Sequence, residues 1–275
     1  LFLPSRFRAP DEDVTIDPWL QRVLGRVIEV SRRHGFSTLV NVIEEPYELA
    51  RLIKGRRVDG CLVRIARYDE ETCRGVREAL AGSRVPVIFL DFFRLDDERT
   101  YVNGNNVGGA TRAVEHLVRS GHRLIAHIAG NPHSFSAQER RKGWEQALRE
   151  AGLPHGDELV AVGGFTEAGG ARAMEALLAR RPRPTAVFCA NDRSAIGAVR
   201  AAVAAGLRVP DDVAVVGFED IEVARYLNPP LTTVRYPFFE MGETGARLLL
   251  EQIGGGQVPR EVRLPEPELV VRQSG

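Results

Sequence analysis

The sequence predicts an α/β protein made of two similar lobes, each containing a doubly wound parallel sheet. The chain has 275 residues, more than a single hydrophobic core usually contains. Short, continuous apolar runs alternate with amphipathic segments of helical period, which is typical of parallel strands covered by helices on both faces. The same alternation occupies both halves of the chain, and this favours two lobes over one large sheet.

The individual elements follow from these runs. In the first half, the runs LFL, STLVNV, GCLV and PVIFL predict strands over residues 1–3, 37–42, 60–63 and 86–90. In the second half, LIAHIA, ELVAV, AVFCA and VAVVGF predict strands over residues 124–129, 158–162, 186–190 and 213–218. We expect helices over residues 19–34, 47–55, 69–81, 106–120, 136–151, 166–179, 192–205 and 239–253. Four of them are followed by Gly35, Gly121, Gly152 and Gly206, where a left-handed residue commonly ends a helix.

Composition excludes several classes of protein. Hydrophobic residues make up 44% and charged residues 27%, an ordinary water-soluble mixture, and no apolar run approaches the roughly 18 residues of a membrane span. The formal net charge of +0 gives the chain no overall attraction to nucleic acid or to an acidic membrane. Cys61, Cys73 and Cys189 have no CxxC spacing, so we expect reduced thiols in a cytoplasmic protein. Because the chain begins at Leu1 without Met, we expect it to be a piece of a longer protein.

Polar side chains follow five of the expected strands: Arg64, Asp91, Asn131, Asn191 and Glu219. Ligands bind at the carboxyl ends of parallel strands, so these positions are candidates for a shared binding site. The alternative is that such residues cap the next helix or fix a turn. Capping or turn formation is favoured for Asp192 and Asn131, ligand binding is favoured for Asp91 and Glu219, and both interpretations stay open for Arg64.

Four segments resemble a known family: GGATRAVEHLVRSGHRLIAHIAG, PTAVFCANDRSAIGAVRAA, VPDDVAVVGFED and NPPLTTVRYPFFEMGETGARLLL. They are similar to segments of LacI-type (lactose-repressor, GalR-like) transcriptional regulators, and the resemblance extends from Gly35 to the C-terminus. It implies a periplasmic-binding-protein-like fold of type I, with two α/β lobes joined by three crossovers and a ligand in the cleft between them. By this resemblance the N-terminal lobe comprises residues 1–104 plus 237–263, and the C-terminal lobe 105–236 plus 264–275.

The resemblance also implies a set of ligand-binding residues. Arg140, in SAQERRKGW, matches the family's ligand-binding arginine, and Glu219, in GFED, stands where an Asp usually binds ligand hydroxyls. Phe165 stands at the position of a stacking aromatic residue, although core packing is an open alternative for it. The complete expected set is Trp19, Arg64, Asp91, Ser136, Arg140, Phe165, Asn191, Glu219 and Tyr236. Such a mixture suits a sugar, because aromatic rings cover its apolar face while charged and amide groups bind its hydroxyls.

The chain departs from the family's pattern at several positions. Glu219 is one methylene longer than the usual Asp, and Arg64 stands where an uncharged residue is common. Together with Arg140, Arg64 allows an anionic group on the ligand. The segment from Arg6 to Asp17 is longer and more acidic than expected, and we assign it no role. Asn105 occupies a position where the family commonly has Asp, which concerns the hydrogen bonding at a crossover.

No enzymatic motif is complete. GFTEAGGA lacks the Lys-Ser/Thr of a phosphate-binding loop, no histidines have HExxH spacing, and no G-x-S-x-G occurs. No pair of carboxylates has identifiable acid and base roles. We therefore expect no enzyme activity, no bound metal and no cofactor.

The sequence thus predicts the effector-sensing and dimerisation domain of a bacterial LacI-type regulator in the cytoplasm, without membrane association. Its partners would be a sugar-like effector, a second copy of the chain, and operator DNA, which would be bound through an N-terminal helix-turn-helix headpiece absent from this sequence. The expected dimer faces are residues 196–204 and 223–228 and the first helix. The alternative is a secreted sugar-binding protein of an ABC transporter, which shares the fold.

Overall fold

The computed structural model describes residues 2–3, 18–42, 46–55, 57–65, 69–92, 95 and 98–275. The chain forms two compact units, unit 1 from Leu1–Gly104 and Pro237–Pro265 and unit 2 from Asn105–Tyr236 and Glu266–Gly275. It therefore passes between the units three times, and the last passage follows Pro265 rather than residue 263. The segment from Arg6 to Asp17 lies outside the described residues.

Unit 1 contains a sheet with helices on both faces. Its strands are β1 (Phe2–Leu3), β2 (Asn41–Val42), β3 (Cys61–Val63), β4 (Val87–Leu90), β5 (Thr100–Asn103) and β11 (Glu261–Arg263). Its helices are α1 (Pro18–Arg33), α2 (Pro46–Lys54), α3 (Glu70–Leu80) and α8 (Phe238–Ile253). Among the described residues the strand order is β2-β1-β3-β4-β5-β11, and all neighbouring strands in this order run parallel.

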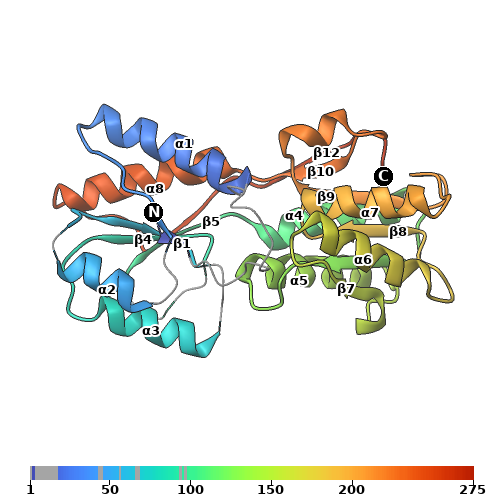
Figure 1. Ribbon diagram of the computed structural model, residues 1–275, viewed down its shortest axis with the longest axis horizontal. Helices are drawn as coiled ribbons and strands as arrows, with labels where there is room; N and C mark the ends of the chain where they lie inside the picture. The colour runs from blue at the N-terminus through green and yellow to red at the C-terminus, as the bar shows by residue number, and fades with distance from the viewer. Residues whose placement is uncertain are drawn as a thin grey trace. The chain divides into compact units, whose positions relative to one another are not determined.

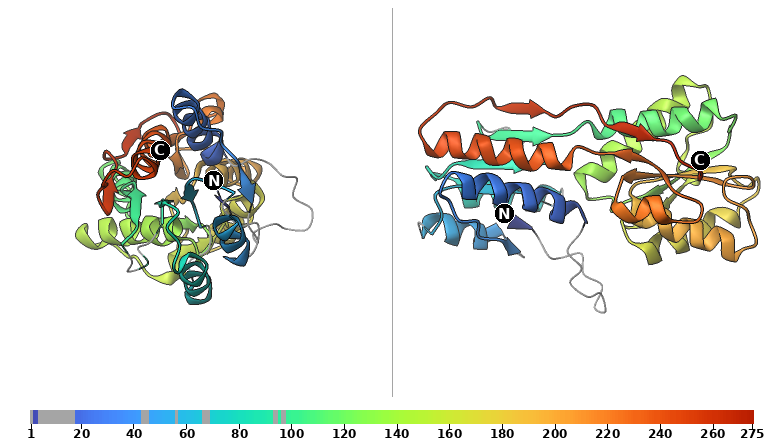
Figure 2. Two further views of the ribbon diagram at one scale, coloured as in Figure 1. Left: turned by 90° about the vertical axis from the view of Figure 1, so that its left-hand side faces the viewer. Right: turned by 90° about the horizontal axis from the view of Figure 1, so that it is seen from above.

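The two faces of the unit 1 sheet are covered by different helix pairs. Helices α1 and α8 lie side by side, and so do α2 and α3 (Figures 1 and 2). Cys61, Val63 and Phe89 point to the α2–α3 face and share one buried cluster with residues of those helices. The intervening residues Leu62 and Leu90 approach Gly245 of α8, as the two-residue period of a strand requires.

Unit 2 repeats this architecture. Its strands are β6 (Ile125–Ala129), β7 (Val160–Val162), β8 (Ala186–Cys189), β9 (Ala214–Glu219), β10 (Thr232–Arg235) and β12 (Glu268–Val270). Its helices are α4 (Asn106–Arg119), α5 (Phe135–Glu150), α6 (Glu167–Leu178) and α7 (Asp192–Ala204), with the short 3-10 helices η1 (Asp157–Leu159) and η2 (Glu222–Tyr226). Within the described residues the order is β7-β6-β8-β9-β10-β12, and α4 packs with α5 and α6 with α7 (Figure 1).

Strand β12 departs from the all-parallel sheet predicted from the sequence, because it pairs antiparallel with β10. The chain leaves unit 2 just after β10 and re-enters it just before β12. Arg235, the last residue of β10, is therefore paired with Glu268, the first residue of β12. A strand that starts where its neighbour ends must run in the opposite direction, and an antiparallel edge strand on a parallel sheet is a common arrangement.

The local predictions are confirmed for the helices and for most of the buried strands. Each of the eight predicted helices is present, with ends displaced by at most about one residue. Gly35, Gly121, Gly152 and Gly206 all have positive φ, as helix-ending residues require. The strand predicted over residues 37–42 is confined to Asn41–Val42, and residues 157–159 form η1 ahead of β7. Strands β5, β10, β11 and β12 were not predicted.

His127 is an unusual residue of the unit 2 core. Its ring is completely buried and stacked between those of Trp144 and Phe188, with centroid separations of 5.7 and 5.1 Å. Nδ1 lies 3.0 Å from the Phe188 carbonyl, which can only accept a hydrogen bond, so Nδ1 carries the proton. Nε2 is buried and has no hydrogen-bond partner among the described residues. Burial lowers the pKa of His127 to about 4 and keeps the ring neutral.

This buried ring predicts an acid-dependent loss of stability. A histidine whose pKa falls from 6.5 to about 4 on folding destabilises the protein as pH falls from about 6.5, by about 3 kcal/mol in full below pH 4. Asp192, whose pKa is raised to about 7, has the opposite effect over part of this range. We therefore expect His127→Gln to change the slope of unfolding free energy against pH, measured by urea denaturation between pH 4.5 and 7.5. His155→Gln, at an exposed histidine, is the control, and equal slopes for His127→Gln and wild type would contradict the prediction.

Candidate functional site

The topology of unit 2 indicates where a ligand would bind. In the order β7-β6-β8-β9-β10, the chain turns in opposite directions from β6, so that β7 lies on one side of β6 and β8 on the other. In doubly wound sheets of this order, ligands bind beyond the carboxyl ends of the strands near that reversal. We call the residues that follow or end β6, β7, β8 and β9 the carboxyl edge of unit 2. Phe165, Asn191 and Glu219 all lie there.

Strained backbone conformations also occur at the carboxyl ends of strands. Four described non-glycine residues have positive φ: Asp91 (48°), Phe165 (67°), Glu219 (118°) and Asp220 (55°). Asp91 directly follows β4, Phe165 follows β7, and Glu219 ends β9. Such conformations cost on the order of 1–3 kcal/mol each and cluster at functional sites. Three of these residues belong to the ligand-binding set predicted from the sequence, so this observation supports a binding function independently of their chemistry.

The guanidinium of Arg140 links the tips of several elements. Arg140 projects from α5 and is only 2% exposed. Its Nη1 donates to the carbonyl of Ala190, at 2.6 Å, and lies 3.4 Å from Oε1 of Glu219. Its Nε donates to Oδ1 of Asn106 at 3.0 Å. The charged group also lies over the ring of Phe218, 4.0 Å from the centroid, which adds a cation–π attraction.

Asn106 extends this network to the end of β10. Its Nδ2 donates to the hydroxyl of Tyr236 at 2.8 Å, while its Oδ1 accepts from Arg140. Tyr236 is buried, and its ring lies 5.5 Å from that of Phe218. The neighbouring Asn105 caps α4 by accepting from the Gly108 amide and donates to Glu266. The amide at position 105 thus performs both donor and acceptor roles, of which an ionised Asp could perform only the second.

Asn191 and Phe165 form the opposite side of the carboxyl edge. Asn191 caps α7 by accepting from the Ser194 amide at 2.9 Å, and its Nδ2 donates to the carbonyl of Phe165 at 3.2 Å. The half-buried ring of Phe165 lies against Gly130, where a Cβ would come within 2.2 Å of Phe165 Cζ. A larger residue at position 130 would therefore force this ring to move from its place at the end of β6. Of the two structural roles predicted for Asp192, capping is wrong, because Asn191 is the cap and Asp192 is the first residue of the helix; its carboxylate instead accepts from the Ile221 amide in the turn after β9.

The remaining predicted residues have separate positions. Ser136 lies one turn before Arg140 on α5, and its hydroxyl is 3.1 Å from that of Ser134. Trp19, Arg64 and Asp91 belong to unit 1. Asp91 is buried after β4, where its amide donates to the Val102 carbonyl, and Arg64 is half-buried directly after β3. Trp19 is in α1, and its side chain lies outside the described residues.

The structure therefore connects Arg140, Phe165, Asn191, Glu219 and Tyr236 around the carboxyl edge of unit 2 and places Ser136 beside them on α5. Their role as ligand contacts stays a prediction. Asn131 accepts from the His133 amide, which confirms its predicted role in a turn.

Sequence reasoning missed two residues of this network, Asn106 and Phe218. Asn106 was predicted only as the start of a helix, because the strand ahead of it, β5, was not recognised. The polar run NGNN after TYV was the available signal that a strand ended there. Phe218 looked like an ordinary core residue of a buried strand. Its contact with a buried guanidinium depends on α5 packing across β9, which no local pattern specifies.

A hollow of about 630 Å³ in unit 1 is distinct from these residues. Val27, Leu62, Leu249 and Ile253 contribute to its walls, and none of the predicted site residues lines it. Its lining includes residues 57–60, which precede β3, so it opens at the amino end of that strand. Ligands of doubly wound sheets bind at the other end. Within the described residues, no group of three or more His, Cys, Asp or Glu side chains could hold a metal ion.

Comparisons with known proteins agree with this fold. The family described as periplasmic binding protein-like domain matches residues 114–275. The HTH-type transcriptional repressor PurR of Mannheimia succiniciproducens is 34% identical over 262 residues, which are 94% of this chain and 77% of the relative. The HTH-type transcriptional regulator CelR of Thermobifida fusca is 38% identical over 259 residues, which are 92% of this chain and 74% of the relative. A solved CelR–cellobiose complex has a TM-score of 0.88 at 33% identity, covering 100% of this chain and 83% of that one.

The fold is that of a periplasmic-binding-protein-like domain. The chain belongs to the LacI family of transcriptional regulators. The relatives named here are transcriptional regulators, which is the first of the two classes that the sequence left open. None of the described helices is long and apolar enough to cross a membrane.

The contact between Arg140 and Glu219 predicts energetic coupling. Both side chains are nearly buried, so removing either charge takes an oppositely charged partner away from the other where water cannot replace it. We expect Arg140→Met and Glu219→Gln each to reduce the free energy of unfolding by about 2 kcal/mol. The double variant should lose less than the sum, with a coupling energy of about 1–2 kcal/mol.

Urea denaturation of the four proteins measures this coupling. The exposed pair Arg119–Glu115, changed in the same way, is the control and should give a much smaller coupling. Additive effects of Arg140→Met and Glu219→Gln would show that the two groups do not interact.

Proposed function

We propose that this chain is the effector-binding and dimerisation domain of a LacI-type regulator and that it binds a sugar or sugar derivative at the carboxyl edge of unit 2. The observation that carries the proposal is the arrangement around Arg140. Its Nε and Nη1 are engaged, whereas no hydrogen bond among the described residues involves Nη2. A guanidinium fixed by its own neighbours and retaining free donors is suited to bind a polar ligand without reorganisation.

The chemistry of the edge favours a sugar. Glu219 supplies a hydroxyl acceptor, Arg140 supplies donors, and the half-buried ring of Phe165 offers an apolar face. This combination matches a pyranose, which has hydroxyls around its rim and C–H groups on its face. The CelR–cellobiose complex supports a sugar because it is a sugar-bound relative of similar fold. Trp19, Arg64 and Asp91 of unit 1 stay predicted as further ligand contacts.

Control of operator DNA is proposed from the family. The curated relatives carry HTH-type names, and the chain spans 74–77% of their length. A ligand alters DNA binding only if it binds two conformations of the regulator with different affinities. In this proposal the cytoplasmic protein responds to effector in that way, and the DNA contacts are made by a headpiece ahead of this domain.

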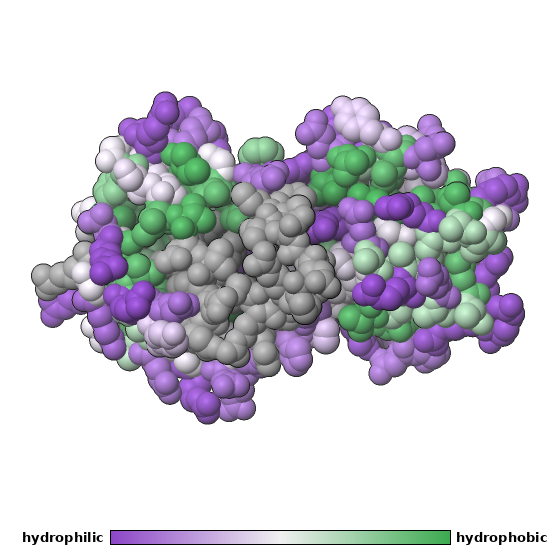
Figure 3. Space-filling model, in the orientation of Figure 1, coloured by the Kyte–Doolittle hydropathy of each residue, from purple (hydrophilic) through white to green (hydrophobic). Residues whose placement is uncertain are grey.

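We further propose a homodimer that uses α7 and η2, with α1 of unit 1. Tyr226 is 72% exposed, and Val203 and Val223 also leave about half of their surface uncovered. Figure 3 shows apolar surface beside the hydrophilic stripe that follows α7. Exposed apolar side chains on neighbouring elements are typical of interfaces, in which aromatic residues contribute much of the binding energy.

A thermal-shift screen tests the ligand class. We expect cellobiose, another β-glucoside or ribose to raise the melting temperature of the chain, because a ligand that binds only the folded state stabilises it by mass action. Adenine and guanine form the comparison panel, since flat purines would also stack on Phe165. Stabilisation by purines and not by any sugar would overturn the sugar assignment.

The same ligand should require the ring of Phe165. Phe165→Leu keeps an apolar side chain over Gly130 but removes the aromatic face, so calorimetry should show affinity weakened roughly three- to tenfold. Phe239→Leu, at an exposed phenylalanine of α8, is the matched control and should bind as wild type does. Equal affinity in both variants would mean that Phe165 only packs against the sheet.

The dimer proposal predicts the effect of a charge on η2. Tyr226→Asp should convert a dimer of twice 30.4 kDa to monomer in sedimentation equilibrium, raising the dissociation constant roughly tenfold or more. Tyr47→Asp, at another exposed tyrosine, should leave the dimer intact. A Tyr226→Asp protein that dimerises as tightly as wild type would exclude η2 from the interface.

A further inference from the structure

Asp192 lies directly behind the carboxyl edge of unit 2 and is completely buried. It is the first residue of α7 and follows Asn191, the cap of that helix. Gly217 of β9 packs against its carboxylate, where a Cβ would lie 2.2 Å from Oδ1. Any larger residue at position 217 would displace the carboxylate, so the close approach of β9 to α7 depends on this glycine.

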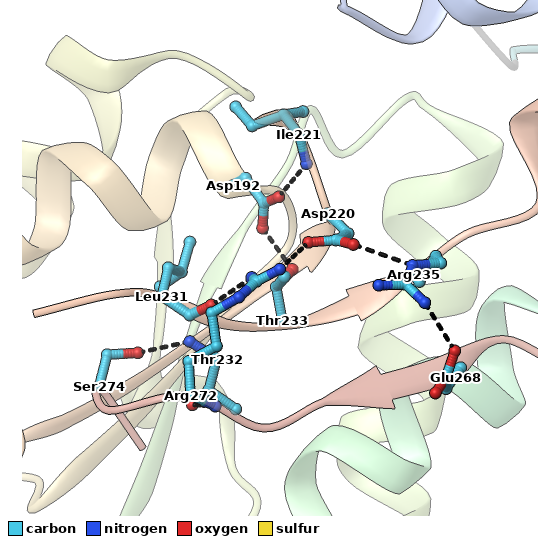
Figure 4. A network of polar contacts seen from close by, with 10 residues as sticks. All are labelled: Asp192, Asp220, Ile221, Leu231, Thr232, Thr233, Arg235, Glu268, Arg272 and Ser274. Atoms are coloured by element: carbon cyan, nitrogen blue, oxygen red, sulfur yellow. Dashed lines mark hydrogen bonds and ion pairs between the residues drawn. The ribbon is translucent and has the colours of Figure 1, made fainter. Parts of the chain in front are cut away.

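Two hydrogen bonds fix the carboxylate to separate elements (Figure 4). Oδ2 accepts from the backbone amide of Ile221 at 2.8 Å, in the turn between β9 and η2. Oδ1 accepts from the hydroxyl of Thr233 at 2.5 Å, on β10. Asp192 thus joins the start of α7 to the end of β9 and to the strand that precedes Tyr236.

The turn that is hydrogen-bonded to the carboxylate of Asp192 has a strained backbone. Glu219 and Asp220 are consecutive residues with positive φ, and Ile221 follows them immediately. Asp220 is fixed independently, because it accepts from Nε of Arg235 at 2.9 Å and from Nη2 of Arg272 at 2.5 Å (Figure 4). A strained backbone persists only where its surroundings over-determine it. The bond from Asp192 to Ile221 is one of the contacts that provide this constraint.

We propose that Asp192 is a positioning residue of the ligand site: its carboxylate sets the orientation of Glu219, through the turn at Ile221, and of the adjacent Asn191. This inference rests on the proposed function, since it concerns the affinity of that same site. Asp192 itself touches no ligand. It acts through the backbone on Asn191, which directly precedes it, and on Glu219, which lies two positions before Ile221.

The charge around Asp192 makes this role sensitive to pH. The titratable and charged groups that face it are Asp220 at the end of β9, Arg272 after β12 and Cys189 of β8, with Arg235 of β10 bound to Asp220. Burial raises the pKa of Asp192 to about 7, although the bonds from Thr233 and Ile221 oppose that change. Both protonation states are therefore populated near neutrality. Protonation weakens the carboxyl group as an acceptor and so loosens the turn.

The expected pH dependence has a definite sign. Ligand affinity should be highest where Asp192 is ionised, above about pH 7, and should fall on the acid side by roughly fivefold or more. Asp192→Asn has the shape of the protonated acid, so it should bind weakly at every pH. Thr233→Val removes a hydrogen bond to the carboxylate and should move the midpoint to higher pH, whereas Thr233→Ser should restore it.

The first experiment needs no ligand. In NMR spectra of the ¹⁵N-labelled chain between pH 5.5 and 8.5, the backbone amide of Ile221 and the side-chain amide of Asn191 should follow one titration curve. That curve should be absent in Asp192→Asn, displaced upward in Thr233→Val and restored in Thr233→Ser. Asp211→Asn, at an exposed aspartate, is the control and should leave it unchanged. If Asp192→Asn fails to fold, the two Thr233 variants carry the test, and identical curves in Thr233→Val and wild type overturn the proposal.

The second experiment separates this inference from the proposed function. Calorimetry with cellobiose, ribose and adenine over the same pH range should show the acid-side loss of affinity in wild type and a flat, weak profile in Asp192→Asn. If no probe binds while the amide titrations behave as expected, the link between Asp192 and its neighbours stands and the proposed ligand classes fall. If a probe binds and Asp192→Asn leaves affinity and pH profile unchanged, the positioning role is wrong.

Discussion

The buried guanidinium of Arg140 is the constraint on which the candidate site depends. A cation removed from water is tolerated only if it is paired and hydrogen-bonded. Arg140 obtains its acceptors from three elements, namely the carbonyl of Ala190 after β8, the carboxylate of Glu219 at the end of β9, and the amide oxygen of Asn106 on α4. Parallel strands end at one edge of a sheet, so the doubly wound topology supplies acceptors that are distant in sequence. Fold and site are thus consequences of the same strand order.

Rigidity at this edge is obtained through strained backbone and close packing. Glu219 and Phe165 both have positive φ, a backbone conformation that residues with a side chain rarely adopt. The conformation of Phe165 places its ring over Gly130. The surrounding polar contacts come from different elements and so over-determine the position of these residues, which is the condition under which such strain is retained. A site held in this way needs little reordering when a ligand arrives, and less free energy is then lost on binding.

Periodicity was sufficient to predict all eight helices and the central strands, because continuous apolar runs and helix-ending glycines are local signals. Strands β5, β10, β11 and β12 were missed because runs such as TYVN and TTVR mix polar with apolar residues. Their pairing depends in part on strands that the chain reaches only after it passes between the units, β11 for β5 and β12 for β10. The antiparallel direction of β12 has the same cause, since it is decided by where the chain re-enters unit 2.

The site residues could likewise be predicted from the sequence only in part. Residues at strand ends, such as Asn191 and Glu219, could be found from the sequence because their position itself was the signal. Asn106 could not, since its importance lies in bridging Arg140 and Tyr236. Capping was wrongly expected for Asp192 because an Asn–Asp pair does not reveal which residue remains outside the helix. The answer depends on whether a buried carboxylate can be accommodated at the first position of the helix. Here Gly217 leaves space for the carboxylate of Asp192, and Thr233 and Ile221 donate hydrogen bonds to it.

The most direct test of the account is a crystal structure of the chain with the sugar that stabilises it most. Because hydrogen bonds hold the Arg140 guanidinium in place, we expect the sugar to lie at the carboxyl edge of unit 2. One of its hydroxyls should be within hydrogen-bond distance of Nη2 of Arg140, and its ring should lie against Phe165. A sugar bound elsewhere, for example in the unit 1 hollow beside Leu249 and Ile253, would contradict it. So would a ligand at the carboxyl edge that makes no contact with Arg140 or Glu219.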